Sequence, residues 1–207
     1  MFQFFYFDRS GVSLIETVDI HQNAITFVQL VRFLANPDLS TLGFDPKLYW
    51  EGNQRRVDIV NGSRTVKYQV DCVMSHGPAM FGSGTTCWVA REVGTRTQLV
   101  IKDNWHGGEF VGEAELLTAA KEAGVPGMTG TLVVDESYTA EKSLTTSLLR
   151  QGQGLGSIGH ENRVFSRIVM DPYGPSIRHF KSGLNLLQAF RDSIESTFYF
   201  PVRCIQC

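Results

Sequence analysis

The sequence predicts an α+β fold in which an antiparallel sheet carries one packed helix. Three observations lead to this prediction. The pair Asn61-Gly62 separates two apolar stretches, which is the strongest local signal for a β-hairpin. Residues 71–102 alternate short apolar stretches with glycine turns, as antiparallel strands do. The stretch 113–123 has apolar residues at helical spacing and runs into Gly124, and glycine commonly follows the last turn of a helix.

The first 64 residues are predicted to be a separate N-terminal region. Residues 1–7 form an aromatic strand, and Asp8 with Ser10-Gly11 indicates a turn. A helix is expected at 24–35, where Asn36-Pro37 stops it. Its apolar face consists of Phe27, Leu30, Val31 and Leu34.

Residues 65–135 are predicted to form the body of the sheet. The first strand, 65–70, alternates apolar and polar residues, so one of its faces should be buried. Further strands are expected at 86–90, 98–102 and 131–134. The helix that begins at Glu113 should pack against one face of this sheet.

The rest of the chain divides into two predicted parts. Residues 136–163 are rich in Gly, Ser, Thr and Gln, a composition typical of a flexible surface insertion. In 164–207 a strand is expected up to Met170, followed by a break at 171–175 and a helix at 183–196. That helix carries an apolar stripe of Leu186, Leu187, Phe190 and Ile194, which we expect to be exposed on at least one side.

Composition excludes several classes of function. The chain has 207 residues, a net charge of −2 and interspersed acidic and basic residues, so it lacks the basic stripe of a nucleic-acid-binding protein. No apolar run reaches the roughly 20 residues that a membrane span needs, and the apolar start lacks the basic residues of a signal peptide. We therefore expect an intracellular location, cytoplasmic or nuclear, with no membrane and no nucleic acid as partner.

The cysteines and histidines do not predict a metal site. The four cysteines are sparse, which favours reduced thiols over a disulfide framework. Cys204 and Cys207 have the spacing of metal ligands but no second pair, and an unstructured chain end is the favoured explanation. The five histidines are scattered and form no ligand cluster with cysteine.

A glycine turn is the first candidate binding element. It contains, in order, Gly82, Ser83, Gly84, Thr85 and Thr86. Glycine lets backbone N–H groups approach phosphate oxygens because no Cβ intervenes. The alternative is a purely structural turn between two strands, which is how such a pattern most often occurs.

Lys102 and a glutamate on the following helix are the second candidate. Lys102 ends an apolar strand, so its amine needs an anion nearby unless it reaches water. On the helix, Glu113 shares a face with Leu116, Leu117 and Ala120, which should pack toward the strands. Glu115 shares its face with polar residues. Glu113 is therefore the favoured partner of Lys102, and Glu115 remains the alternative.

Several short segments, in order, resemble the fungal-type protein kinase family. Phe7-Asp8-Arg9-Ser10-Gly11 and Leu42-Gly43-Phe44-Asp45-Pro46 are similar to segments of its N-terminal region. Gly84 to Trp88 is similar to its Gly-Thr-x-x-Trp loop, and Leu99 to Trp105 to its lysine strand. Shorter matches follow at 124–127, 180–182 and 190–194.

The resemblance implies an ATP-binding lobe that works with Mg²⁺ and transfers phosphate to a protein hydroxyl. Gly82 to Thr86 and Lys102 would then hold the ATP phosphates, with Glu113 pairing the lysine. Adenine would lie at Val89 and at the hinge formed by Val169, Met170 and Asp171. An ordinary strand end remains the alternative for the hinge.

The sequence departs from the family pattern after Ile194. No His-Arg-Asp loop and no Asp-Phe-Gly motif occurs in the chain. We therefore expect a small lobe with only the start of the helical lobe, truncated before the catalytic loop and inactive by itself, without a protein ligand for metal. A pseudokinase-like binding module and an unrelated α+β binding domain are the alternatives.

Overall fold

The computed structural model describes residues 1–125, 132–138, 143–152, 154–155, 159–171 and 179–199. Its fold is α+β, as predicted. A seven-stranded antiparallel sheet has the order β3-β4-β5-β6-β7-β9-β8, and β1-β2 form a separate hairpin. The strands are β1 Phe2–Asp8, β2 Gly11–Val18, β3 Leu48–Glu51, β4 Gln54–Asn61, β5 Arg64–His76, β6 Thr86–Glu92, β7 Leu99–Gly107, β8 Leu132–Val134 and β9 Arg163–Met170. The helices are α1 Ala24–Leu34, α2 Glu113–Glu122, α3 Thr146–Gly152 and α4 Gly183–Tyr199, with short 3-10 turns η1 Leu39–Leu42 and η2 Glu136–Tyr138.

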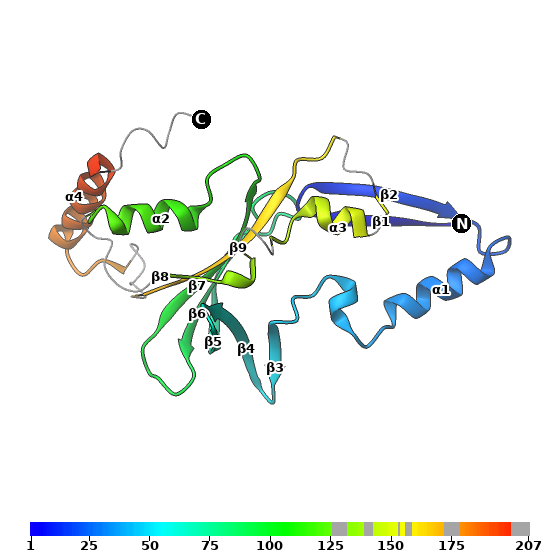
Figure 1. Ribbon diagram of the computed structural model, residues 1–207, viewed down its shortest axis with the longest axis horizontal. Coiled ribbons are helices and arrows are strands. Elements are labelled where there is room, and N and C mark those ends of the chain that lie inside the picture. The colour runs from blue at the N-terminus through cyan, green and yellow to red at the C-terminus, as the bar shows by residue number, and fades with distance from the viewer. Residues whose placement is uncertain (126–131, 139–142, 153, 156–158, 172–178, 200–207) are drawn as a thin grey trace.

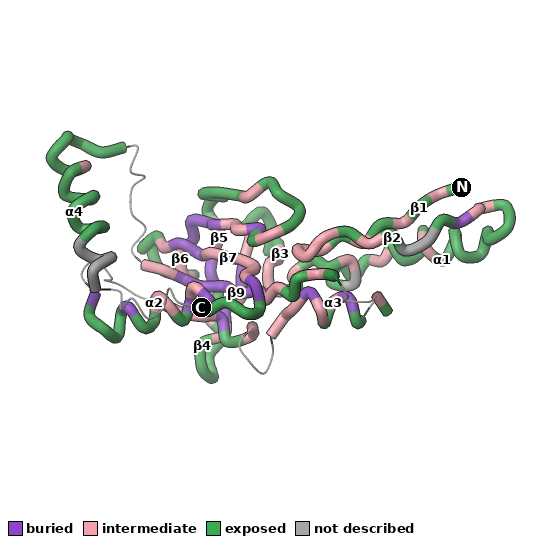
Figure 2. Tube along the Cα trace, turned by 90° about the horizontal axis from the view of Figure 1, so that it is seen from above, coloured by how far each residue is buried: buried purple, intermediate pink, exposed green. Residues whose placement is uncertain are grey.

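The elements lie along an elongated molecule. The β1-β2 hairpin and α1 are at one end, α4 is at the other, and the sheet lies between them (Figure 1). Buried residues concentrate in the sheet, whereas α1 and α4 are mostly exposed (Figure 2). Within α1 no residue is buried.

The predicted hairpin at Asn61-Gly62 is confirmed, with its turn placed one residue later than the Asn-Gly signal implies. Asn61 is the last residue of β4 and pairs with Arg64 of β5, so Gly62 and Ser63 form the two-residue loop. Gly62 has φ +61°, and among the described residues only glycines have positive φ. A glycine at the first of two loop positions is typical of a type II′ turn, whose twist matches that of the strands.

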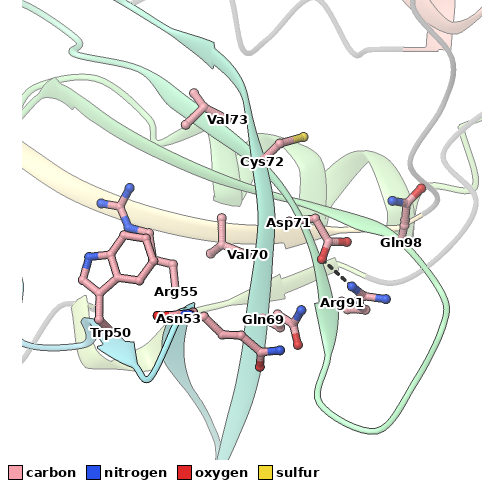
Figure 3. Close-up of a pocket in the computed structure, with 11 residues that line it drawn as sticks. Trp50, Asn53, Arg55, Gln69, Val70, Asp71, Cys72, Val73, Arg91 and Gln98 are labelled. Carbon is pink, nitrogen blue, oxygen red and sulfur yellow. Dashed lines mark ion pairs between the residues drawn. The ribbon is translucent and has the colours of Figure 1, made fainter.

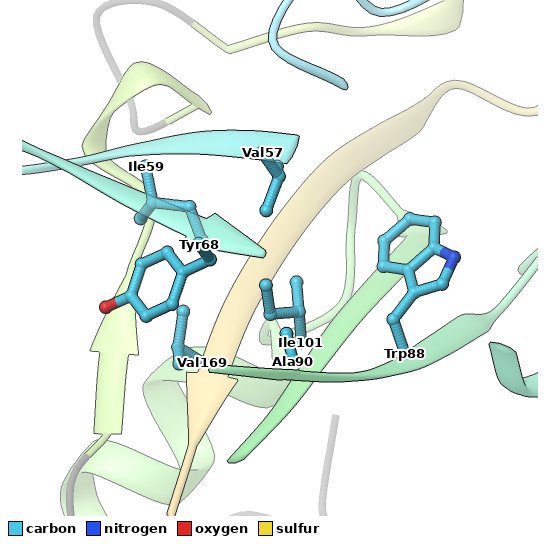
Figure 4. Close-up of a cluster of buried hydrophobic side chains, with 7 residues drawn as sticks. All are labelled: Val57, Ile59, Tyr68, Trp88, Ala90, Ile101 and Val169. Carbon is cyan, nitrogen blue, oxygen red and sulfur yellow. The ribbon is translucent and has the colours of Figure 1, made fainter. Parts of the chain in front are cut away.

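The two faces of the sheet have different surroundings. One face carries the core cluster, defined as Val57, Ile59, Tyr68, Trp88, Ala90, Ile101 and Val169 (Figure 4). Ile101 is 0% exposed, and burying such a side chain is worth roughly 1.5–3 kcal/mol. Side chains alternate along a strand, so Val100 and Lys102 point to the opposite face from Ile101.

Helix α2 ends as the sequence predicts. Gly124 has φ +67°, and its N–H donates to the carbonyl of Lys121, while the N–H of Val125 donates to that of Ala120. These two bonds define the Schellman motif, which satisfies carbonyls that the helix end leaves open. Val125 and Ala120 are both 4% exposed, so an apolar contact accompanies the motif.

Helix α4 exposes its apolar stripe, as expected. Leu187, Phe190 and Ile194 are 66%, 48% and 58% exposed, and Leu186 is partly buried. Ser182 precedes the helix and accepts a hydrogen bond from the N–H of Asn185, which caps its first turn.

Two buried ion pairs attach the N-terminal segments to distant parts of the chain. Asp8 contacts Arg150 of α3 at 2.7 Å, and both side chains are at most 4% exposed. Asp45 contacts Arg167 of β9, also at 2.7 Å. Arg167 is 1% exposed and makes two further bonds of 2.7 Å to Asp103.

The prediction that 136–163 is a surface insertion is wrong for α3. Thr146 and Arg150 are each 1% exposed, because the N-terminal hairpin covers them. Composition indicated flexibility, yet the partners that order α3 lie more than 130 residues away. Residues 139–142, 153 and 156–158 of this range lie outside the described residues, as do 126–131, 172–178 and 200–207, which include Cys204 and Cys207.

The sheet also crosses the predicted boundary at residue 64. β3 and β4 come from the range 1–64, yet β4 pairs with β5 from Arg55 to Asn61. The sheet is curved, since the N–H of Val60 on β4 donates to Asp135, which follows β8 at the other edge, at 3.1 Å.

Candidate functional site

Lys102 and Glu113 form an ion pair between β7 and α2. The Lys102 Nζ lies 2.6 Å from each carboxylate oxygen of Glu113. Their side chains are 23% and 33% exposed, so the pair is partly shielded from water. Glu113 is the first residue of α2, where a carboxylate is favoured by the helix dipole. The alternative partner, Glu115, is exposed.

A neighbouring amide network orients this carboxylate. Asn104 lies two residues after Lys102 on the same face of β7 and donates from Nδ2 to Glu113 Oε2 at 3.5 Å. Its Oδ1 accepts a hydrogen bond from Ser166 on β9 at 3.0 Å. Sequence reasoning missed Asn104, although its spacing from Lys102 places it on that face.

The strand register aligns a row of side chains beside Lys102. Cys72, Val89, Val100 and Met170 are opposite one another on β5, β6, β7 and β9. Val89 and Val100 are buried at 3% and 9% exposure. Val100 is two residues before Lys102, so this row lies on the face of the sheet that carries the lysine. Val89 and Met170 are therefore placed together with Lys102.

Val169 is placed differently. It pairs with Ile101, and its side chain belongs to the core cluster on the other face. A ligand beside Lys102 can meet only the backbone of Val169. The prediction for 169–171 considered only that a strand ends there. The face of the sheet on which the Val169 side chain lies is set by its pairing with Ile101 of β7. Asp171 directly follows β9 and is partly buried.

The glycine-rich loop, defined as residues 77–85, joins β5 to β6. Gly82 and Gly84 have φ +85° and +49°, values that favour glycine. The carbonyl of Ser83 accepts a hydrogen bond from the N–H of Trp105 on β7 at 2.7 Å. Thr86 begins β6 and pairs with Asp103, the neighbour of Lys102. The predicted phosphate-binding residues are thus adjacent to Lys102 along the ladder between β6 and β7.

The turn between β1 and β2 touches this loop. Arg9 donates from Nη1 to the carbonyl oxygens of Ala79 and Met80 at 2.7 and 3.3 Å. Its own carbonyl accepts the N–H of Gly82 at 2.9 Å. Gly84 is buried, and a Cβ built on it would lie 2.1 Å from Arg9 Cζ. Sequence reasoning treated Arg9 only as part of a matching segment.

A buried charge network lies on the face of the sheet that carries the core cluster, next to β6, the strand that follows the glycine-rich loop. Arg167 lies between the rings of Phe165, Tyr138 and Trp88 at 5.5–6.0 Å. Burial alone would lower the pKa of Arg167, but the hydrogen bonds and charge of Asp103 and the charge of Asp45 outweigh it, so the pKa is raised. Arg167 therefore stays charged, and its function is structural. An arginine inside the apolar strand 163–170 was the sequence signal for such a pair.

Two cavities lie away from Lys102. A groove of about 680 Å³ is formed by β3 to β6 and includes Trp50 and Arg55, together with the 2.8 Å ion pair of Asp71 and Arg91 (Figure 3). A cavity of about 510 Å³ lies between 107–110 and 160–162. None of the residues predicted to hold ATP lines either cavity.

The described residues contain neither a cluster of metal ligands nor a helix that could span a membrane. No group of three or more His, Cys, Asp or Glu side chains is arranged to hold a metal ion there. In the same part of the chain, no helix has the length and apolar character to cross a membrane.

Comparison with known proteins gives one match. The model of a family described as fungal protein kinase matches residues 1–199. No curated protein and no solved structure matches the chain. The match spans the N-terminal hairpin, the glycine-rich loop, the Lys102–Glu113 pair and α4, which is nearly the whole sequence. The chain therefore belongs to the fungal protein kinase family.

Proposed function

We propose that this chain is an ATP-binding lobe of a fungal-type protein kinase that binds nucleotide weakly and does not transfer phosphate by itself. The Lys102–Glu113 ion pair carries this proposal. In protein kinases a strand lysine contacts the nucleotide phosphates and is held by a glutamate of the following helix. Here the same two residue types meet at 2.6 Å from a strand and the helix after it.

The proposed nucleotide lies on the Lys102 face of the sheet. Its phosphates would contact Lys102 and the loop residues Gly82 to Thr86, and its adenine would lie near Val89 and Met170. The N–H of Gly82 donates to Arg9, whereas those of Ser83 and Thr85 have no partner among the described residues. We therefore assign the backbone contacts to Ser83 and Thr85.

The proposed lack of phosphotransfer rests on missing groups. In kinases the base that accepts the hydroxyl proton belongs to a His-Arg-Asp loop, and Mg²⁺ is held by an Asp-Phe-Gly aspartate and an asparagine. The 207 residues contain neither motif. With no protein carboxylate assigned to Mg²⁺ and no second wall over the nucleotide, affinity should be low, because a typical site encloses most of its ligand.

The test is titration of the purified chain with a fluorescent ATP analogue and Mg²⁺, followed by displacement with ATP. Lys102→Ala should weaken binding about tenfold or more, since a partly buried charge contact is lost. Lys121→Ala removes an exposed lysine of α2 and is the matched control. Equal affinity of the Lys102→Ala variant and the parent chain would refute the proposed site.

Location of the nucleotide can be tested through Cys72. This thiol is exposed, and it stands in the row that includes Val89 and Val100, whereas Cys87 is buried. Cys72 also lines the groove that contains Trp50, so the test includes Lys102→Ala. In a Cys204→Ser, Cys207→Ser background, alkylation of Cys72 should slow when ATP is added, and this slowing should be lost in Lys102→Ala at the same ATP concentration. An unchanged rate at saturating ATP would place the nucleotide elsewhere. Radiolabelled ATP should show no turnover, and turnover that depends on Lys102 would disprove the inactive state.

A pseudokinase-like binding module is the second candidate. The observation that favours it is the exposed apolar surface of α1, where Ile25, Val28 and Leu34 are 76%, 63% and 59% exposed. Exposed apolar patches of this kind mark interaction sites. Under this alternative the chain binds a protein partner and shows no Lys102-dependent binding of ATP.

A further inference from the structure

We propose that Arg9 is a positioning residue for the glycine-rich loop, so that the N-terminal hairpin sets the affinity of the loop for nucleotide phosphates. This inference rests on the function proposed above. Four contacts carry it: the two bonds from Arg9 Nη1 to loop carbonyls, the bond from Gly82 N–H to the Arg9 carbonyl, and the packing of the guanidinium on Gly84.

The support under Arg9 is rigid. Asp8 accepts hydrogen bonds from the N–H groups of Ser10 and Gly11 at 2.8 and 3.1 Å, which fixes the turn. The same carboxylate is paired with Arg150, which is 1% exposed. Ser10 Oγ donates to the backbone carbonyl of Glu161 and is also hydrogen-bonded to the hydroxyl of Thr146 in α3. Arg9 is thus held by a turn that is fixed to α3 and to Glu161, which precedes β9.

The loop by itself has little to fix it. It contains three glycines, of which Gly82 and Gly84 have positive φ, and its larger side chains Met80 and Phe81 are 55% and 50% exposed. Outside the Arg9 contacts, its backbone is hydrogen-bonded by the N–H of Trp105 at the Ser83 carbonyl, by Thr86 Oγ1 at the Gly84 carbonyl over 3.5 Å, and by the N–H of Gly77 at the Thr85 carbonyl. Within the described part of the chain, the backbone of segment 78–82 between these points is hydrogen-bonded only to Arg9.

The consequence for binding is entropic. Ser83 and Thr85 can donate to a phosphate only while the loop is ordered. Arg9→Ala removes the side-chain contacts and keeps the bond from Gly82 N–H to the backbone carbonyl of residue 9, so the variant must order part of the loop when it binds nucleotide. Ordering even one or two residues reduces affinity about tenfold. Arg9→Ala should therefore weaken ATP binding about tenfold, as a rise in Kd.

If Arg9 contacted phosphate directly through its charge, Arg9→Ala would also lower the affinity for ATP. A second variant therefore separates the two roles. Arg9→Lys keeps the charge but lacks the planar guanidinium, which packs on Gly84 while its Nη1 bonds the two carbonyls. Positioning predicts that Arg9→Lys loses nearly as much affinity as Arg9→Ala. Retained affinity in Arg9→Lys would overturn the positioning role.

Gly84→Ala is an independent perturbation of the same contact. The new Cβ would occupy the place of the Arg9 guanidinium and displace it. Positioning predicts that the two changes are not additive: in an Arg9→Ala background, Gly84→Ala should raise the Kd by a smaller factor than in the parent chain. Equal factors in both backgrounds would count against the inference.

The closing experiment measures hydrogen–deuterium exchange of the full chain together with ATP-analogue binding. Arg9→Ala should speed exchange in a peptide covering 77–86 and leave the β4–β5 peptide 54–70 unchanged, which also verifies folding. Arg32→Ala, which removes an exposed arginine of α1, should change neither quantity.

Each outcome has one reading. Faster loop exchange with weaker binding supports the inference. Unchanged loop exchange overturns it, whether or not nucleotide binds. Faster exchange with unchanged Kd overturns the link to nucleotide. A parent chain that binds no nucleotide, with a loop that still depends on Arg9, refutes the proposed function and removes the nucleotide role of Arg9 with it.

Discussion

Replacing Asp103 with alanine leaves the cation of Arg167 almost unpaired inside the protein. Arg167 is 1% exposed, and Asp103 accepts bonds from its Nε and Nη2, both at 2.7 Å. After the change only the bond from Nη2 to Asp45 remains. Breaking a buried ion pair in this way costs about 3–5 kcal/mol of unfolding free energy. Asp45→Ala is the comparison, because it removes one charged hydrogen bond to Arg167, worth about 2 kcal/mol, and two bonds at a partly exposed carboxylate, from the N–H of Lys47 and from Tyr138 Oη.

Urea unfolding followed by circular dichroism measures both values. The midpoint should fall more for Asp103→Ala than for Asp45→Ala, with the slope m unchanged. Adding Arg167→Met to Asp103→Ala removes the unpaired charge, and the aromatic rings around it can accept the thioether, so stability should return to within about 1 kcal/mol of the parent. An Asp45→Ala variant that is less stable than Asp103→Ala would refute the assignment of Asp103 as the main partner.

Three further predictions concern other elements. Gly124→Ala should lower stability by about 1 kcal/mol in urea unfolding, because alanine disfavours φ +67°, whereas Gly152→Ala in α3 should change it little; equal effects would exclude the Schellman argument. Burial raises the pKa of Tyr138 above its ordinary value of 10.0, so stability is full below pH 10 and falls as pH rises further; Tyr138→Phe should lose less stability between pH 9 and 11, and parallel pH profiles would contradict this. Leu187→Gln on the exposed stripe of α4 should change the free energy of unfolding by less than about 0.5 kcal/mol and reduce binding of an apolar dye. A large loss of stability would show that the residue is covered.

Local patterns in the sequence predicted the parts of the fold that depend on neighbours in the chain. The Asn61-Gly62 signal predicted the β4–β5 hairpin, and Gly124 predicted the end of α2, because turn and cap geometry are properties of a few residues. The choice of Glu113 over Glu115 came from helical spacing alone, and the structure joins Glu113 to Lys102. That these residues hold ATP phosphates stays a prediction.

The features that were missed depend on contacts across long stretches of chain. Arg150 lies in a segment whose composition indicated a surface insertion, and only Asp8 of the hairpin explains its burial. The side of the sheet on which Val169 lies follows from its pairing with Ile101, which a single strand cannot reveal. Arg9 carried no local signal for its contact with Gly84, because the two are joined only in the folded chain.

The pair of Asp8 and Arg150 also sets an order of events during synthesis. The two residues are 142 positions apart, so at roughly 5–20 residues per second Asp8 is made on the order of ten seconds before its partner. During that interval the β1-β2 hairpin has no α3 to attach to, and Tyr6, whose ring meets the Arg150 guanidinium in the folded protein, lacks that contact. The N-terminal hairpin therefore becomes fixed to α3 only after most of the chain has been made, whereas the loop residues that Arg9 contacts are made about midway between them.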